Sequence, residues 1–353
     1  MSELSEGHGR QVMTVTGPVN ATSLGLTLMH EHILNDCRCW WHQPHEPERQ
    51  ALALGPVRAG ILGELRMDPF VTLDNCSLDE EDVAIAELKH FVATGGTTVV
   101  DPTCRGIGRN PQALVRISKA TGLQIIMGSG YYLHTSHPPE LAQLSVDEIA
   151  DEIVAEAREG VEGTGIRIGL IGEIGVSSEF TEAERKSLRG AARAQRRTGL
   201  PLMIHLPAWF RLGHQVLDLV EAEGSDLHHT VLCHMNPSGE DVTYQTSLAR
   251  RGAFIEYDMI GMDYWYADQQ VQCPSDEENA RFIRRLVDTG LTCQILLSQD
   301  VFLKMMLTKY GGFGYAYVIK HFVPRLHRHG VSQDNIQLML RENPRRVFSS
   351  KAN

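Results

Sequence analysis

The sequence lacks several features that would mark a membrane or secreted protein. No window approaches the roughly 18 consecutive apolar residues that a membrane-spanning helix needs. The N-terminus, MSELSEGHGRQVMTVTG, is polar and has no apolar stretch ahead of a cleavage site. The seven cysteines include no CxxC pair, and their number is odd in a chain too long to depend on disulfides. We therefore expect reduced thiols and a cytoplasmic protein.

The sequence also has fewer basic residues than acidic ones. The chain carries 33 Lys and Arg against 44 Asp and Glu, which gives a formal net charge of −11. This balance argues against nucleic acid or an anionic membrane as the main partner. Hydrophobic residues make up 42% of the 353 positions, enough for a large core. Because α/β barrels commonly use this length as one domain, we expect a single domain over 1–353.

Eight short apolar runs, most of them followed by a polar stretch of helical character, indicate alternating strands and helices. Glycine ends several of the helical stretches, as at Gly122 and Gly199, where it suits the left-handed position that stops a helix. Buried parallel strands repeated about eight times predict an α/β fold, the (β/α)8 TIM barrel. The runs are Leu26–Met29, Thr97–Val100, Gln124–Met127, Ile168–Ile174, Leu202–Ile204, Thr230–Leu232, Ala253–Glu256 and Gln294–Leu297.

Local signals also predict where helices begin and where loops are long. Residues 77–80 and 181–184 have the pattern of a capping box, the first ahead of a helix over 82–94. Asn110-Pro111 suits the start of another helix. Two connections, about 33–75 and 257–279, exceed the usual loop length. Both would lie on the C-terminal face of a barrel, where loops after the strands build active sites.

The strongest chemical signal is His30-Glu31-His32 at the end of the first apolar run. Residues i and i+2 of a strand point to the same side, so both imidazoles can face one metal ion. Taken alone, a chance HxH among 16 histidines explains the motif about equally well.

Four further residues favour the metal interpretation, because each lies at or near the C-terminal end of a different run: Glu173, His205, His234 and Asp300. A carboxylate inside an apolar run is costly to bury unless it is paired or metal-bound, and glycines flank Glu173 and leave room for it. Imidazole and carboxylate ligands suit zinc, manganese, cobalt or iron. Strand alternation predicts that Cys233, beside His234, points away from the metal face.

The order of these residues resembles that of the binuclear amidohydrolase superfamily, and within it the phosphotriesterase-related proteins. The resemblance runs along nearly the whole chain, through TLMHEHI, GGTTVVDPT, IGEIG, the runs ending in His205 and His234, and ENPRRVF. It implies an amidohydrolase-like barrel with two divalent cations, zinc first, and a homodimer. His30, His32 and Asp300 would hold the buried metal, and His205 with His234 the exposed one.

One ligand departs from the best-known pattern of the family. Well-known members bridge the two metals with a carboxylated lysine, where this chain has Glu173. A glutamate can bridge as an anion without added CO2, but whether it does so here stays open. Two cations sharing one water would supply a bridging hydroxide near neutral pH. Asp300 is then expected to be catalytic, as acceptor of the proton from that hydroxide.

The substrate pocket is less clearly marked. In the resembling lactonases a tyrosine near GSGYYLH helps to orient the carbonyl, and the sequence leaves open whether Tyr131 or Tyr132 does so. Trp265 is expected to bind substrate, and the other long-loop aromatics could form a pocket wall or anchor the loops: Trp40, Trp41, Tyr264 and Tyr266. Arg105, Arg109 and Lys304 could meet an anionic substrate group or could simply be solvated.

These residues predict a hydrolase that acts on a small molecule. Hydrolysis of a carboxylic ester, with a lactone as the leading substrate, is the first choice. Hydrolysis of an amide such as an N-acyl amino compound is the main alternative, and a phosphotriester is a further one. The metals would serve each reaction similarly, so the pocket must separate them. A different class, a small-molecule-binding protein with a vestigial metal site, is opposed by the complete ligand set.

Overall fold

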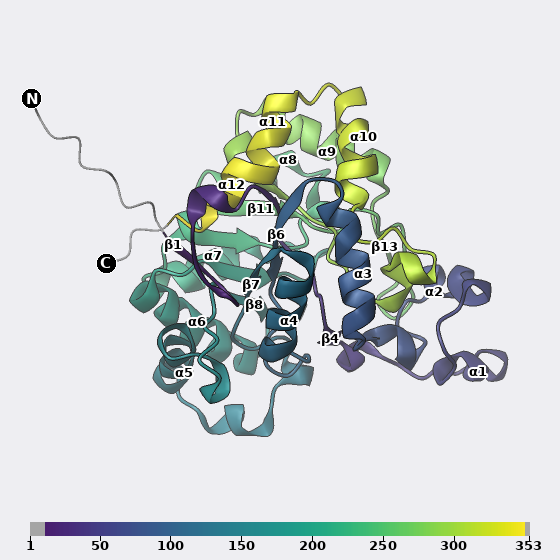
Figure 1. Ribbon diagram of the computed structural model, residues 1–353, viewed down its shortest axis with the longest axis horizontal. Coiled ribbons are helices and arrows are strands. Elements are labelled where there is room, and N and C mark those ends of the chain that lie inside the picture. The colour runs from purple at the N-terminus through teal and green to yellow at the C-terminus, as the bar shows by residue number, and fades with distance from the viewer. Residues whose placement is uncertain (1–10, 350–353) are drawn as a thin grey trace, which may run out of the picture.

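The protein is a (β/α)8 TIM barrel, and each predicted apolar run contributes one strand (Figure 1). The computed structural model describes residues 11–349, so most of the polar N-terminal segment lies outside it. The barrel strands are β3 (Leu26–Leu28), β6 (Gly96–Asp101), β7 (Gln124–Met127), β8 (Ile171–Gly175), β9 (Leu202–His205), β10 (Thr230–Leu232), β11 (Phe254–Tyr257) and β14 (Ile295–Leu297).

The strands lie in sequence order and parallel, in two sheets of order β3-β6-β7 and β14-β11-β10-β9-β8. Further backbone hydrogen bonds bridge the two gaps between the sheets. Gly169 N donates to Met127 O at 3.0 Å between β7 and β8. Asp300 N donates to His30 O at 3.1 Å between the residues that follow β14 and β3. The last strand therefore meets the first next to two of the predicted metal ligands.

Helices follow the strands and cover the barrel: α3 (Glu81–Val92), α4 (Pro111–Thr121), α5 (Val146–Arg158), α6 (Glu182–Thr198), α7 (Gly213–Ala222), α8 (Val242–Ala249), α9 (Asp276–Asp288), α10 (Val323–Arg328), α11 (Gln333–Gln337) and α12 (Asn343–Val347). The capping box at Thr181 and the N-cap at Asn110 are confirmed. The capping box at Ser77 is wrong, because Ser77–Leu78 forms β5 and pairs with β4 (Asn35–Asp36) from the first long connection.

Alternate strand residues face two separate apolar cores. Val99, Ile125 and Ile204 belong to the large core between the strands and the helices. Val100, Ile126 and Met203, one residue away in each case, belong to a second core that fills the barrel. That core also takes Val12 from β1 (Gln11–Thr14) and Phe348 after α12. β1 pairs with β2 (Gly17–Asn20). Residues near both ends of the described range therefore help to fill the barrel.

The two long connections fold into short elements at the mouth of the barrel. The first contains α1 (Gln50–Ala53) and α2 (Leu62–Met67), which project to one side in Figure 1. The second contains the hairpin β12 (Trp265–Tyr266) and β13 (Val271–Gln272).

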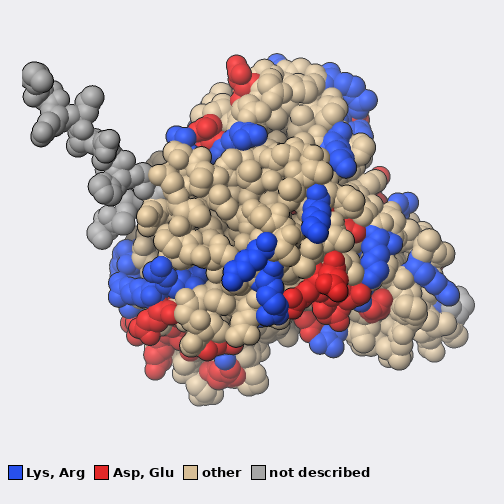
Figure 2. Space-filling model, viewed as in Figure 1, with Lys and Arg blue, Asp and Glu red and all other residues tan. Residues whose placement is uncertain are grey.

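No helix in the range 11–349 has both the length and the apolar character needed to cross a membrane. On the face of the molecule drawn in Figure 2, Lys and Arg side chains lie beside Asp and Glu side chains.

Candidate metal centre

The six predicted ligands converge at the C-terminal mouth of the barrel. His30 and His32 follow β3, Glu173 lies within β8 and His205 is the last residue of β9. His234 and Asp300 come two and three residues after the ends of β10 and β14. His205 is partly exposed, and the other five are buried.

One group of donor atoms comes from His30, His32, Glu173 and Asp300. Nε2 of His30 lies 3.5 Å from Glu173 Oε2 and 3.6 Å from Asp300 Oδ1. Nε2 of His32 lies 3.3 Å from Glu173 Oε1 and 3.4 Å from Asp300 Oδ1. Tetrahedral ligands about 2.1 Å from one zinc ion would be separated by about 3.4 Å. The donors of His30, His32 and Asp300 therefore have a spacing that suits three ligands of one ion, with Glu173 beside them.

A second group adjoins the first and shares Glu173 with it. Nδ1 of His205 lies 2.8 Å from Nε2 of His234 and 3.2 Å from Glu173 Oε2. Nε2 of His234 lies 3.4 Å from the same carboxylate oxygen. Glu173 thus has one oxygen beside His32 and the other beside His30, His205 and His234. This arrangement suits a carboxylate between two cations.

The chemistry of the donor set also fits divalent cations. Nε2 of His30 and Oδ1 of Asp300 are buried and have no hydrogen-bond partner within 11–349. Buried polar atoms are seldom left without a partner, and a cation between these two would satisfy both. Imidazole nitrogens and carboxylate oxygens are ligands that zinc and related transition metals accept. The residues therefore fit a pair of divalent cations.

The carboxylates around the histidines draw positive charge into the centre. Burial opposes charge on His30, but Glu173 and Asp300 hold its pKa well above the ordinary range. Burial likewise opposes charge on His234, but Asp258 and Glu173 raise its pKa to about 10. Burial and the neighbouring His234 lower the pKa of His205. The carboxylates of Glu173, Asp300 and Asp258 therefore give the site a negative charge that favours protons or metal ions.

Two of the six candidate ligands have left-handed backbone conformations. φ is 58° at His234 and 48° at Asp300, and only three other non-glycine residues in the described range have positive φ. Such a conformation is sterically costly for most residues and needs support from the surrounding structure. Buried carboxylates that the sequence analysis missed, Asp258 and Glu31, provide this support.

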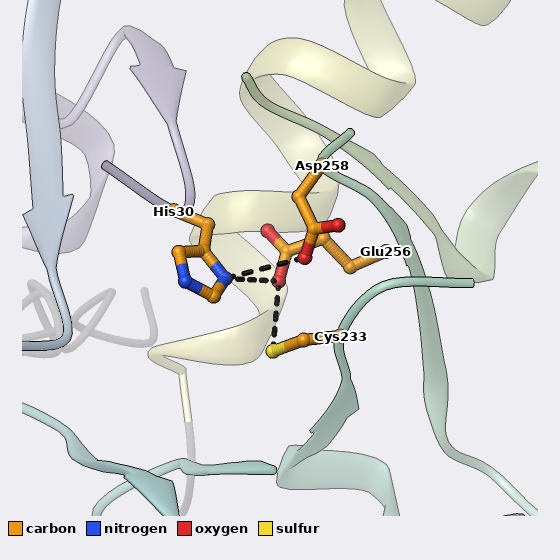
Figure 3. A group of neighbouring side chains, drawn as sticks. All are labelled: His30, Cys233, Glu256 and Asp258. Carbon is orange, nitrogen blue, oxygen red and sulfur yellow. Dashed lines mark hydrogen bonds and ion pairs between the residues drawn. The ribbon is translucent and has the colours of Figure 1, made fainter. Parts of the chain in front are cut away.

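Asp258, just after β11, holds one histidine from each group of donors. The backbone N–H of His234 donates to both oxygens of Asp258 at 3.0 Å, and Nδ1 of His234 lies 3.1 Å from Oδ1. Nδ1 of His30 lies 3.2 Å from the other oxygen, Oδ2 (Figure 3). Histidines that bind metal are commonly oriented through their second ring nitrogen in this way. Phe254, Glu256 and Asp258 face the barrel interior by alternation, a signal that could have identified Asp258.

Cys233 lies inside the barrel, below His30, with Glu256 beside it (Figure 3). Its thiol donates to Glu256 Oε2 at 3.4 Å, and burial raises the pKa of Glu256 to about 7. The prediction that alternation turns Cys233 away is wrong. β10 ends at Leu232, and the left-handed backbone of His234 lets successive residues point toward the same region.

Glu31, between the two histidines, ties the end of β3 to the segment that carries Asp300. Its Oε1 accepts hydrogen bonds from Ser298 Oγ at 2.8 Å, Gln299 N at 2.9 Å and Gln299 Nε2 at 3.0 Å. Its Oε2 accepts one from Val301 N at 2.9 Å. The backbone amides on both sides of Asp300 are therefore bound to one fully buried carboxylate.

The glycines around Glu173 have a different role from the one predicted. A Cβ on Gly172 would lie 2.2 Å from Met203 O, and a Cβ on Gly175 would lie 2.2 Å from Tyr132 C. Both glycines therefore allow neighbouring backbone to approach β8 closely, rather than making room for the carboxylate.

A cavity of about 560 Å³ opens above the candidate metal centre. Tyr132 lines it, with its ring edge-on to His205 at 4.8 Å between centroids, and its hydroxyl oxygen accepts a hydrogen bond from Trp40 Nε1 at 3.2 Å. Tyr131 lies outside the cavity wall, because consecutive side chains point in opposite directions and its hydroxyl donates to Glu152. Tyr132, and not Tyr131, therefore lies beside the candidate metal centre.

Of the other aromatic residues proposed for the pocket, some line the cavity and some do not. Trp40 and Tyr266 line the cavity, whereas Trp41, Tyr264 and Trp265 are not part of its wall. Trp265 and Tyr266 are consecutive residues of β12, so only one of the two side chains faces inward. The prediction that Trp265 contacts substrate is therefore not supported by its placement.

Comparisons with known proteins place the chain in a known family. The Phosphotriesterase family model matches residues 10–348. The N-acetyltaurine hydrolase of Danio rerio is 35% identical, over 99% of this chain and 100% of the relative. A resiniferatoxin-binding protein from Rhodobacter sphaeroides is 64% identical with a TM-score of 0.96, over 100% of both chains. The lactonase Lmo2620 from Listeria monocytogenes is 26% identical with a TM-score of 0.79, over 97% of this chain and 99% of that one.

The family model spans nearly the whole chain, including all six candidate ligands, the carboxylates behind them and the wall of the cavity. The match covers the full length of both the Danio rerio relative and the Rhodobacter sphaeroides protein. The chain therefore belongs to the phosphotriesterase family of hydrolases.

Proposed function

We propose that this protein is a metal-dependent hydrolase of a carboxylic ester, with a lactone as the leading substrate. One observation carries the proposal: five of the six side chains suited to two divalent cations line a cavity whose remaining wall is largely aromatic and apolar, and the sixth, His30, is buried beside them. Such a site combines polar chemistry at one end with a surface for an uncharged organic group. The similarity to a lactonase supports the same choice.

The residues of the site would bind the cations, accept a proton and orient the substrate. His30, His32 and Asp300 would hold the buried cation, His205 and His234 the exposed one, with Glu173 between them. Bound cations of this kind lower the pKa of water and polarise a carbonyl oxygen. Asp300 would accept a proton during attack on the carbonyl carbon. Because the oxygen of Tyr132 already accepts the Trp40 N–H, its hydroxyl proton is available to a substrate oxygen.

Hydrolysis of an amide is the second candidate, because N-acetyltaurine hydrolases are among the relatives of this chain. The reaction needs the same attack on a carbonyl carbon, followed by departure of an amine rather than an alcohol. The leaving nitrogen must receive a proton, which Asp300 could return. Hydrolysis of a phosphotriester is a further option on the grounds of family membership.

A binding protein is the alternative from a different class, and the similarity to a resiniferatoxin-binding protein favours it. The intact set of six candidate ligands opposes it. A site that only binds an organic molecule has no need of two buried histidines with carboxylates at metal-ligand spacing. The two classes differ in a simple observable, which is turnover by the metal-loaded protein.

A substrate panel with the zinc- or manganese-loaded protein tests the proposal. It would contain γ-lactones, phosphorylated lactones, N-acyl amino compounds including N-acetyltaurine, and phosphotriesters. We expect about two metal equivalents per chain by mass spectrometry, fastest turnover on a lactone, and loss of that turnover after chelation. Fastest turnover on an N-acyl compound would favour the amidase. Metal-loaded protein that binds but turns over no member of the panel would favour the binding protein.

Asp258→Asn tests whether the carboxylate behind the histidines supports metal binding. Asparagine keeps one acceptor oxygen but presents an N–H₂ to His30 or His234, so one histidine loses its orienting partner. We expect zinc affinity to fall by about tenfold, measured by competition with a chelator. Asp241→Asn is the matched control, because Asp241 caps α8 on the outside of the barrel and asparagine also caps helices. Equal zinc affinity in both variants and the unmodified protein would contradict this role.

A further inference from the structure

The cavity wall away from the metal centre is a connected set of aromatic rings. Trp40 stacks on Phe70 with centroids 5.4 Å apart, and Phe70 lies 5.4 Å from Tyr266. Tyr266 in turn meets Trp209 at 5.4 Å, and Phe70 meets Phe302 at 6.2 Å. All of these rings line the cavity, together with Met259 and Met262. This wall can remove a large apolar or aromatic group from water.

Apart from the candidate ligands, the acidic residues of the cavity wall are Glu184 and Glu179, and the one basic residue among the described residues that line it is His134. Glu184 lines it but is buried and already accepts hydrogen bonds from Ser177 Oγ at 2.8 Å and Thr181 N at 2.9 Å. Glu179 is exposed at the mouth and forms no ion pair with any residue of the described range. Its carboxylate is therefore free to act on a molecule that enters.

The nearby basic side chains that could have bound an anionic substrate group form ion pairs with acidic residues of the chain instead. Arg109 forms a bidentate pair with Glu156, at 2.7 and 2.8 Å. Lys304 is bound to Asp74 at 2.6 Å, and Arg105 to Glu140 at 2.5 Å. None of the three lines the cavity, whose wall between positions 11 and 349 contains neither lysine nor arginine.

We infer that the substrate is uncharged or cationic away from its scissile group and carries a large apolar or aromatic group that packs on the ring wall. This inference deepens the proposed function and rests on it for the position of the scissile carbonyl at the metal centre. A sulfonate or carboxylate on the distal group would lose its hydration without gaining a lysine or arginine as its partner. Glu179 would also repel it across the mouth. The protein would then differ in substrate charge from its N-acetyltaurine-hydrolysing relatives.

Binding of a matched pair of ketones tests the inference without requiring turnover. Benzylacetone and its para-sulfonate differ only in one negative charge on the ring, and neither has a bond that the enzyme could hydrolyse. We expect the zinc-loaded protein to bind benzylacetone at least tenfold more tightly, measured by calorimetry at moderate ionic strength. Equal affinity, or tighter binding of the sulfonate, would overturn the inference.

A charge reversal at the mouth tests whether Glu179 contributes to the discrimination. In Glu179→Lys we expect the affinity ratio between the two ketones to fall by about tenfold, because repulsion becomes attraction. Glu182→Lys is the matched control: its side chain is 96% exposed on α6, outside the cavity wall, and the change in net charge is the same. A ratio that is unchanged in Glu179→Lys, or that falls equally in Glu182→Lys, would overturn the role of this carboxylate.

Turnover of a matched pair of lactones separates this inference from the proposed function. γ-Phenyl-γ-butyrolactone and its para-sulfonate are the substrates, and we expect kcat/KM at least tenfold higher for the neutral one. Equal rates on both would overturn the inference and leave the hydrolase proposal standing. If neither lactone is hydrolysed but the two ketones still differ in affinity, the proposed function fails and the charge selectivity of the cavity stands.

Discussion

Asp300→Asn should lower kcat by about a thousandfold while most of the bound metal is retained. Asparagine keeps an oxygen in the position of Oδ1, which lies 3.6 Å from His30 Nε2 and 3.4 Å from His32 Nε2. It also tolerates the left-handed backbone that position 300 adopts. An amide cannot accept a proton at working pH, however, and general acid–base catalysis contributes about a hundredfold to ten-thousandfold. The expected result is thus a loss of turnover with a smaller loss of metal.

The measurement pairs steady-state kinetics with metal content for each variant. Asp300→Ala is the companion variant, because it removes the candidate ligand oxygen as well as the proton acceptor. We expect Asp300→Ala to lose both metal and turnover, and Asp300→Asn to lose mainly turnover. If Asp300→Asn kept full kcat at unchanged metal content, another group would have to accept the proton.

The strands and the six candidate ligands could be predicted because both follow from strand geometry. Buried parallel strands give continuous apolar runs, and their C-terminal ends must meet at one face of a closed barrel. A histidine or carboxylate at such an end is conspicuous against the apolar run before it. His205 and Glu173 were found in this way, without information on loop conformation.

The cavity wall could not be predicted because it depends on loops. Tyr131 and Tyr132 are chemically equivalent in the sequence, and only the path of the backbone after β7 decides which ring meets His205. The same applies to Trp265 and Tyr266 in the hairpin of the second long connection. Ser77 illustrates a related limit. Its local sequence predicts the start of a helix, but residues 77–78 instead pair with β4, where Asn35 lies 42 residues before Ser77 in the chain.

The buried carboxylates were missed for a different reason. Asp258 and Glu31 look like ordinary acidic residues near strand ends, and the His30-Glu31-His32 motif alone assigns no role to Glu31. Their role depends on the left-handed backbones of His234 and Asp300, which the sequence gives little reason to expect. A buried charge is nevertheless unfavourable without several donors, so each buried acid near a strand end identifies a neighbouring backbone segment that needs support.

Glu31→Gln should lower kcat by about a hundredfold and destabilise the fold by roughly 2–4 kcal/mol, the cost of one or two buried donors left without an acceptor. Four donors point at the two oxygens of Glu31, from Ser298, Gln299 and Val301. Glutamine offers one oxygen and two N–H groups, so at least one of these donors must face another N–H. The segment around Asp300 then loses its attachment on one side.

The loss of turnover follows from the position of Asp300 between the two supported amides. Its left-handed backbone is held by bonds to Gln299 N and Val301 N, and release of either would let the segment relax. A displacement of about 1 Å in a reacting group can cost about a hundredfold in rate. We therefore expect the defect in kcat, with a smaller change in KM, because the aromatic wall of the cavity is left intact.

Glu87→Gln is the control that separates this positioning role from general destabilisation. Glu87 is also a buried carboxylate, and it accepts hydrogen bonds from Thr308 N at 3.0 Å, Thr308 Oγ1 at 2.7 Å and Lys309 N at 2.8 Å. It supports a loop outside the cavity, so its loss should cost comparable stability but little kcat. Denaturant unfolding and steady-state kinetics on both variants provide the comparison. Equal losses of kcat at equal losses of stability would mean that Glu31 acts only through the stability of the fold and not through the placement of Asp300.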